Sequence, residues 1–133
     1  MWLDYAFNKG KVDHMFGGAL DLDEVELERF GFNSTTSVSF TFVIKGLPEK
    51  YPEKWKNKGY NAMSISLEFC EIESLKVDVS GLGFQCSPKI DASSEKAVIL
   101  IRGDKFSIVC ESAFINIEGF TPYIDLRWGS GLA

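Results

Sequence analysis

The sequence predicts a mainly β protein, an antiparallel sheet or sandwich of about six to nine strands with few short helices. Apolar and polar residues alternate with a period of two in several segments, as they do in a strand with one buried face. β-Branched and aromatic residues are frequent, and they fit the half-buried surface of a pleated sheet. Apolar residues at helical spacing do not continue long enough for a major helix. With 133 residues, the chain is expected to form a single domain, residues 1–133.

Alternation places the expected strands along the chain. Val38 and Phe40 share one face of a segment whose other face carries serine and threonine. Residues 63–69 and 75–79 alternate in the same way, whereas the apolar run 98–101 predicts a strand covered on both faces. In chain order, the expected strands cover residues 20–27, 37–44, 63–69, 75–79, 98–101, 106–110, 114–117 and 124–128.

Turn-forming residues separate these strands. Residues 102–105, with the sequence Arg-Gly-Asp-Lys, predict a tight hairpin turn. Short helices are compatible with residues 5–16 and with residues 53–58. The other breaks expected from glycine, proline and small polar residues lie at residues 31–36, 81–83 and 119–122.

The alternation of apolar and polar residues changes phase in two segments that are rich in carboxylates. Apolar parity changes between Leu22 and Val25, and it shifts again between Phe69 and Leu75. A one-residue slip would turn every following side chain to the other face of the sheet. Each place therefore predicts a bulge or a turn.

Composition and charge argue against several classes of protein. The formal net charge is −5 at pH 7, whereas a nucleic-acid binder draws its affinity from Lys and Arg that displace counterions. The first residues lack the basic and apolar regions of a signal peptide, and no stretch approaches roughly 18 consecutive apolar residues. We therefore expect a cytoplasmic protein that binds neither nucleic acid nor membrane.

Residues that could carry chemistry are few. Cys70, Cys86 and Cys110 are odd in number and widely spaced, so they predict free thiols rather than a disulfide framework or a zinc site. His14 is the one histidine, and its neighbours match no nucleophile or metal motif. The sequence therefore predicts no enzymatic activity, no metal and no cofactor.

Acidic residues gather in two segments. Residues 20–29 hold five carboxylates and one arginine, and residues 68–78 hold four carboxylates and one lysine. One interpretation is the solvated face of a strand. The other is a surface that steers a basic partner and accepts hydrogen bonds from its Lys and Arg side chains. In that second interpretation, the candidate partner-binding acids are Asp21, Asp23, Glu24, Glu26, Glu71 and Glu73.

The segment between the second and third expected strands has the opposite charge. Residues 49–58 carry four lysines and two glutamates, with Tyr51 and Trp55 between them. Long loops in small domains are often functional, so both aromatic residues are candidate anchors for a partner. Trp55 is equally compatible with a lid over the open end of the core. Lysine beside aromatic residues also fits single-stranded nucleic acid, an interpretation that the acidic remainder of the chain disfavours.

Several of these segments together resemble a known family. They are His14-Met15-Phe16, the acidic segment 20–27, Pro52-Glu53-Lys54-Trp55, the segment 67–77 and the aromatic and cysteine segment 106–110. In this order they are similar to the bacterial immunity-protein family numbered 50, and more broadly to β-rich immunity proteins of polymorphic toxin systems. The similarity covers residues 12–123. It implies a cytoplasmic protein that sequesters one cognate toxin domain.

Two functional hypotheses follow. The first is an immunity protein, a monomer or homodimer of a contact-dependent inhibition system, that neutralises a basic toxin domain by tight stoichiometric binding at or near its active site. Tyr51 and Trp55 would then be buried anchors, and the carboxylates would set orientation and association rate. The alternative is a β-barrel or sandwich that binds a small apolar ligand in its aromatic-rich core.

Overall fold

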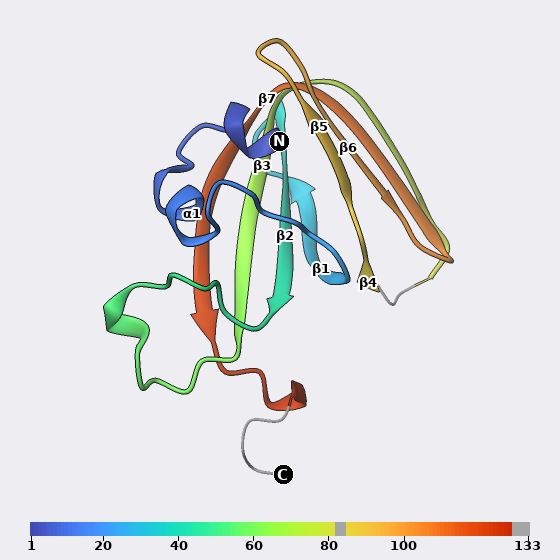
Figure 1. Ribbon diagram of the computed structural model, residues 1–133. Helices are drawn as coiled ribbons and strands as arrows, with labels where there is room; N and C mark the ends of the chain where they lie inside the picture. Colours follow the sequence, from blue (N-terminus) through green and yellow to red (C-terminus); the bar gives the residue numbers. More distant parts are fainter. Residues whose placement is uncertain (82–84, 129–133) are drawn as a thin grey trace.

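The protein is built on one continuous sheet of seven antiparallel strands (Figure 1), as the computed structural model of residues 1–81 and 85–128 shows. This architecture confirms the expected mainly β fold class. The strands are β1 (Val25–Phe32), β2 (Ser37–Lys45), β3 (Ala62–Val79), β4 (Gln85–Cys86), β5 (Lys89–Ala92), β6 (Ala97–Arg102) and β7 (Phe106–Tyr123), in the spatial order β4-β1-β2-β3-β7-β6-β5. The helical elements are short: η1 (Trp2–Tyr5), α1 (Gly10–Met15), η2 (Glu53–Trp55) and η3 (Leu126–Trp128).

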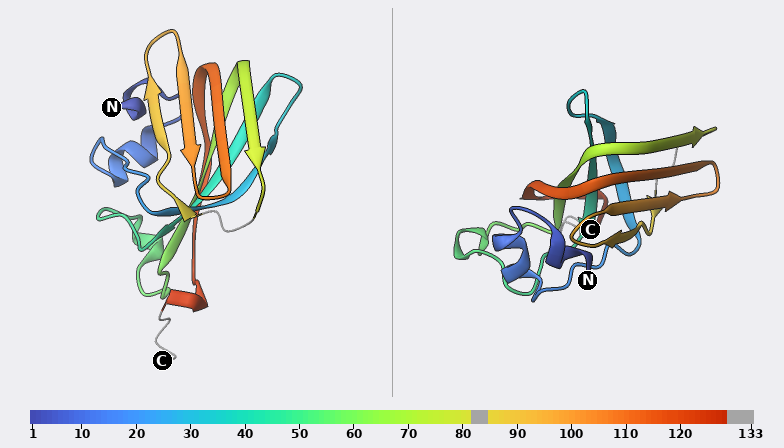
Figure 2. Two further views of the ribbon diagram at one scale, coloured as in Figure 1. Left: turned by 90° about the vertical axis from the view of Figure 1, so that its right-hand side faces the viewer. Right: turned by 90° about the horizontal axis from the view of Figure 1, so that it is seen from above.

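The sheet is folded into two layers because its two longest strands run through both. β3 and β7 have 18 residues each and pair along their whole length. The first half of β3, residues 62–70, also pairs with β2, whereas the first half of β7, residues 107–112, pairs with β6. β1, β2 and one half of the long pair therefore form the first layer, and β5, β6 and the other half form the second. Figure 2 shows the two layers at an angle to each other.

A local distortion in β3 lies where the layers part. Glu71 has a positive φ of 57°, and the β3–β7 register shifts between Ile72 and Ser74. The Ile72 amide then donates to the carbonyl of Thr36 in the β1–β2 turn, beyond the end of the β2 ladder. The expected phase change between Phe69 and Leu75 is therefore confirmed as a bulge. The other one is also confirmed, since Glu24 has a positive φ of 51° directly before β1.

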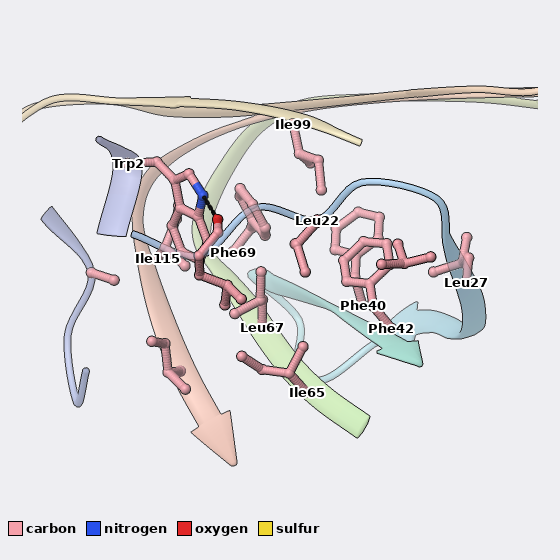
Figure 3. Close-up of a cluster of buried hydrophobic side chains, with 14 of the residues drawn as sticks. Trp2, Leu22, Leu27, Phe40, Phe42, Ile65, Leu67, Phe69, Ile99 and Ile115 are labelled. Carbon is pink, nitrogen blue, oxygen red and sulfur yellow. Dashed lines mark hydrogen bonds between the residues drawn. The ribbon is translucent and has the colours of Figure 1, made fainter. Parts of the chain in front are cut away.

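The space between the layers is filled by the N-terminal segment. Its backbone crosses the inner face of the sheet, and Leu20 and Leu22 are buried there. Figure 3 shows Leu22 beside Phe40 of the first layer and Ile99 of the second. The Trp2 indole nitrogen donates to the carbonyl of Leu20 at 3.3 Å, which satisfies both groups inside the core.

The two edges of the sheet are joined by one stretch of chain. β4 pairs with β1 at one edge and β5 pairs with β6 at the other, and only Ser87 and Pro88 separate β4 from β5. Pro88 donates no backbone hydrogen bond, so it suits the point where the chain leaves one ladder for the other. The sequence pattern did not predict β4 or β5, because both are short and alternate weakly.

Some expected boundaries are wrong. Residues 63–69 and 75–79 are one strand, because a bulge lets β3 continue through its phase change. Residues 106–110 and 114–117 are also one strand, because β7 pairs with β3 along its whole length. The expected break at 119–122 lies inside β7 for the same reason. The expected break at 81–83 extends beyond the described residues.

The expected last strand, residues 124–128, is also wrong. β3 begins at Ala62, opposite Tyr123, so the chain beyond Tyr123 has no strand left to pair with. The chain turns away instead. The Asp125 amide donates to Asn61 Oδ1 at 2.7 Å, and η3 follows with Leu126 exposed. Within the described ranges, no helix is long and apolar enough to cross a membrane.

The buried position of Leu22 predicts that the N-terminal segment is part of the cooperative core. Leu22→Ala should lower the free energy of unfolding by about 2–5 kcal/mol, because it leaves a cavity between the layers. Leu126→Ala is the matched control, since that side chain is 68% exposed and its loss should cost less than about 0.5 kcal/mol. Urea unfolding measures both variants. Equal losses in the two variants would contradict the role of the segment as a core element.

Candidate functional site

The outer face of the first layer is hollowed and lined with hydroxyl groups. Alternation sends the large apolar residues of β2 and β3, such as Phe40, Phe42 and Ile65, inward and most of their serine and threonine residues outward. Small outward side chains leave a hollow of about 520 Å³ above the strands. The side chains that line it include Ser39, Thr41, Ser64, Ser66, Glu118 and Thr121. We call this surface the hydroxyl face.

Glu118 enters the hydroxyl face through a bulge. The β3–β7 register shifts between Ser66 and Leu67, which pair with Gly119 and Ile117, so Glu118 is the extra residue between those partners. Its carboxylate is exposed and accepts a hydrogen bond of 2.6 Å from the Ser39 hydroxyl, across β3. The bulge thus adds one negative charge to an otherwise neutral stretch of strand.

A second carboxylate is held rigidly at the end of the face nearer the bend. Glu68 accepts hydrogen bonds from the side chains of Asn33 at 2.6 Å, Ser37 at 2.8 Å and Asn116 at 3.2 Å. Asn116 is held in turn by Asn8, whose amide nitrogen donates to it at 2.6 Å. These bonds favour the ionised form, Asn33 most strongly, and they lower the pKa of Glu68. The carboxylate therefore stays charged and in one orientation.

An ion-pair network ties the C-terminal segment to β1. Arg127 donates to both carboxylate oxygens of Glu26, at 3.1 and 2.8 Å, and it pairs with the buried Asp125 at 2.6 Å. Hydrogen bonds from Arg127 lower the pKa of Asp125. Glu26 is therefore already paired within the protein.

The structure does not bring the two predicted acidic segments together. Asp21 and Glu24 are exposed just before β1, and Asp23 accepts a hydrogen bond of 2.7 Å from Ser87. Glu71 and Glu73 are also exposed, but they lie at the bend of β3, beside the turn that follows β1. The two groups of acids are thus at opposite ends of β1.

The predicted aromatic anchors lie in the loop between β2 and β3. Trp55 is only 6% exposed, and its ring lies 6.0 Å from that of Phe120 and 6.4 Å from that of Tyr60, between ring centroids. Tyr51 stacks on the other side of the Trp55 ring at 6.4 Å and stays 40% exposed. Of the two interpretations of Trp55, its burial favours the lid.

The described residues form no candidate metal centre. His14 is exposed on α1, and no cluster of His, Cys, Asp or Glu in residues 1–81 and 85–128 could hold a metal ion. The three cysteines are free thiols. Burial raises the pKa of Cys86 and of Cys110 to about 11, so both thiols are protonated and unreactive at neutral pH.

Sequence reasoning missed the two carboxylates of the hydroxyl face. Glu68 stands at the end of an alternating strand, where it was counted as part of an acidic segment, and Glu118 stands alone in the sequence. The signal for the face itself was present, since serine and threonine recur opposite the apolar residues of two strands. The bulge that exposes Glu118 depends on the pairing partner and has no local pattern.

One comparison with known proteins identifies a family. The family model described as Immunity protein 50 matches residues 8–123, which confirms the resemblance inferred from the sequence. No curated protein and no solved structure matches the chain.

The hydrogen bonds to Glu68 predict a pH-dependent contribution to stability. The folded-state pKa lies below the unfolded value of about 4.3, so this contribution is complete above that pH and is lost as the pH falls through the folded pKa. Glu68→Gln should therefore lower the free energy of unfolding at neutral pH by about 1–2 kcal/mol. The difference from the unsubstituted protein should shrink in acid. Urea unfolding at a series of pH values tests this, with the exposed Glu73→Gln as control. A difference that is constant with pH would refute the assignment.

Proposed function

The chain belongs to the Immunity protein 50 family, and from this premise we propose that it neutralises one cognate bacterial toxin domain by tight stoichiometric binding. It acts in the cytoplasm as part of a polymorphic toxin or contact-dependent inhibition system, at or near the active site of the toxin. It works by binding and not by catalysis.

The hydroxyl face is the observation that carries the proposal. It offers a hollow lined by serine and threonine hydroxyl groups and by Glu118, with Arg29 and Phe32 on its β1 side. The carboxylate of Glu68 lies at the end of this face, where Ser37 donates to it. Short side chains lose little rotamer freedom on binding, and Glu68 is already oriented by three donors. Such a surface fits Lys and Arg side chains of a basic toxin, since hydrogen bonds between charged partners are the strong ones.

The predicted acids outside this face have a different part in the proposal. Asp21 and Glu24 are exposed before β1, and Glu71 and Glu73 are exposed at the bend. Charges at the rim of an interface act over a distance, so they raise the association rate more than they lengthen the life of the complex. Asp23 and Glu26 add to the same field, although each already has a partner within the protein.

The alternative of a small apolar ligand gains no support. The inner space where such a ligand would bind is occupied by Leu20, Leu22 and the side chains around them. Trp55 is buried and belongs to the same core cluster. Of the two proposed anchors, Tyr51 has exposed surface that a partner can contact. The buried Trp55 ring stacks on the Tyr51 ring.

The proposal predicts a one-to-one complex that depends on the hydroxyl face. Isothermal titration with the cognate toxin domain should give that stoichiometry. Ser66→Arg, which fills the hollow with a bulky cation, should raise Kd about 100-fold, equivalent to about 2.7 kcal/mol. Ser107→Arg is the matched control in the second layer and should leave Kd unchanged. Thermal melting verifies that both variants fold.

Two results would count against this proposal. If the unsubstituted protein forms no complex with the toxin domain, neutralisation by binding is wrong. If Ser66→Arg and Ser107→Arg bind equally well, the interface lies on another face.

The exposed acids predict an effect on association. Replacing Asp21, Asp23 and Glu24 together by their amides should slow toxin association several-fold and flatten its dependence on salt, because long-range steering is lost. Dissociation should change little. Stopped-flow fluorescence at low and high salt measures both rates. The control replaces three exposed acids of the second layer and its turns, Asp91, Glu95 and Asp104, by their amides. If both triple variants associate equally slowly, the net charge of the protein sets the association rate, and the position of the acids before β1 does not.

A further inference from the structure

A groove between α1 and the β2–β3 loop lies on the side of the first layer opposite β1. Its volume is about 780 Å³, and its floor is formed by Met15, Trp55 and Phe120. Figure 1 shows the two flanking elements, α1 and the loop that contains η2, beside the second half of β7. The groove is therefore built from three parts of the chain that are far apart in sequence.

The groove runs along an edge of the sheet. Residues 119–123 of β7 pair with β3 on one side, and on the other side the described residues provide only the isolated bridge from Phe7 to Asn116. A second hollow, of about 490 Å³, extends along the same edge and shares Lys11 and Phe120 with the first. Together they offer room for an extended segment of polypeptide. Pro122, which lacks an amide hydrogen, limits backbone pairing at one end.

The rim of the groove is basic, although the protein as a whole is acidic. Lys11, Lys50 and Lys54 line it together with His14 and one acid, Glu53, so the three lysines and one glutamate give a local charge of +2. The chain carries a net −5. None of the three lysines forms an ion pair within residues 1–81 and 85–128, and Glu53 is 3.8 Å from Lys56. The positive charge of the rim is therefore available to a partner.

We propose that this groove binds an extended acidic segment of a partner polypeptide. An apolar side chain of that segment would pack on Tyr51 and Phe120, and its carboxylates would reach the rim lysines. The groove and the hydroxyl face present opposite charge. Disproof of toxin binding at the hydroxyl face would therefore leave the proposed binding of an acidic segment in the groove unaffected.

A polypeptide fits the groove better than a nucleic acid does. Single-stranded nucleic acid needs exposed ring faces on which successive bases stack. Trp55 is 6% exposed and covered by Tyr51 on one face, so its ring offers no platform for a stacked base.

Fluorescence anisotropy with defined peptides tests the proposal. The probe is a fluorescein-labelled peptide, Glu-Glu-Leu-Phe-Glu-Glu, and the control probe has glutamine in place of glutamate. The acidic peptide should bind at least about tenfold more tightly than the amide peptide at low salt. The double variant Lys50→Glu with Lys54→Glu should weaken binding of the acidic peptide about tenfold. Lys76→Glu with Lys89→Glu, two exposed lysines elsewhere, is the matched control and should bind as the unsubstituted protein does.

Three results would overturn the inference: no binding of the acidic peptide, equal binding of both peptides, or equal weakening by both double variants. An oligothymidylate that displaces the peptide from the groove would instead assign it to nucleic acid. Amide chemical shifts of Lys11, His14 and Lys54, which line the groove and not the hydroxyl face, should move on addition of the acidic peptide. A response confined to other residues would place the peptide elsewhere. Thermal melting establishes that both double variants are folded.

Discussion

The bend shared by β3 and β7 is the constraint on which the other elements depend. A sheet with one apolar face must bury that face against another layer. Here β3 and β7 run through both layers, so the second layer of the same sheet covers the apolar face of the first. Glu71 lies at the point where β3 parts from β2, and the layers diverge from there. The space between them is too wide for the two layers to fill alone, and Trp2, Leu20 and Leu22 complete the core. Because Phe40, Phe42 and the alternating apolar residues of β3 face inward, the outer face of these two strands carries mainly serine and threonine.

Much of this fold follows from the sequence, because alternation reports which face of a strand is buried. β2, β6 and the turn between β6 and β7 lie where the pattern predicts them. Both phase changes were also visible, at Glu24 and near Glu71. The pattern could not show that the strand continues beyond the second phase change, because a bulge and a turn have the same local signature. It also could not show β4 and β5, whose pairing depends on where β1 and β6 lie.

The candidate sites were less predictable, because each is assembled from distant segments. Glu68 is oriented by Asn33 and Asn116, and the rim of the groove joins Lys11 to Lys50. No window of sequence contains such a set. The sequence did identify the loop with Tyr51 and Trp55 as unusual in charge and aromatic content. Only the structure distinguishes the roles of these two residues, since the Trp55 ring is buried and the Tyr51 ring that stacks on it is partly exposed.

The position of the N-terminal segment has a consequence for the newly made chain. Phe7 bridges Asn116, and the apolar residues of the segment are covered only when the sheet behind them is complete. The ribosome releases this segment well before it releases β7. At a synthesis rate of about 5–20 residues per second, the roughly 100 intervening residues take on the order of 5–20 s. For that interval Trp2, Leu20 and Leu22 are exposed on an unfinished chain, which makes it a substrate for chaperones that bind apolar segments.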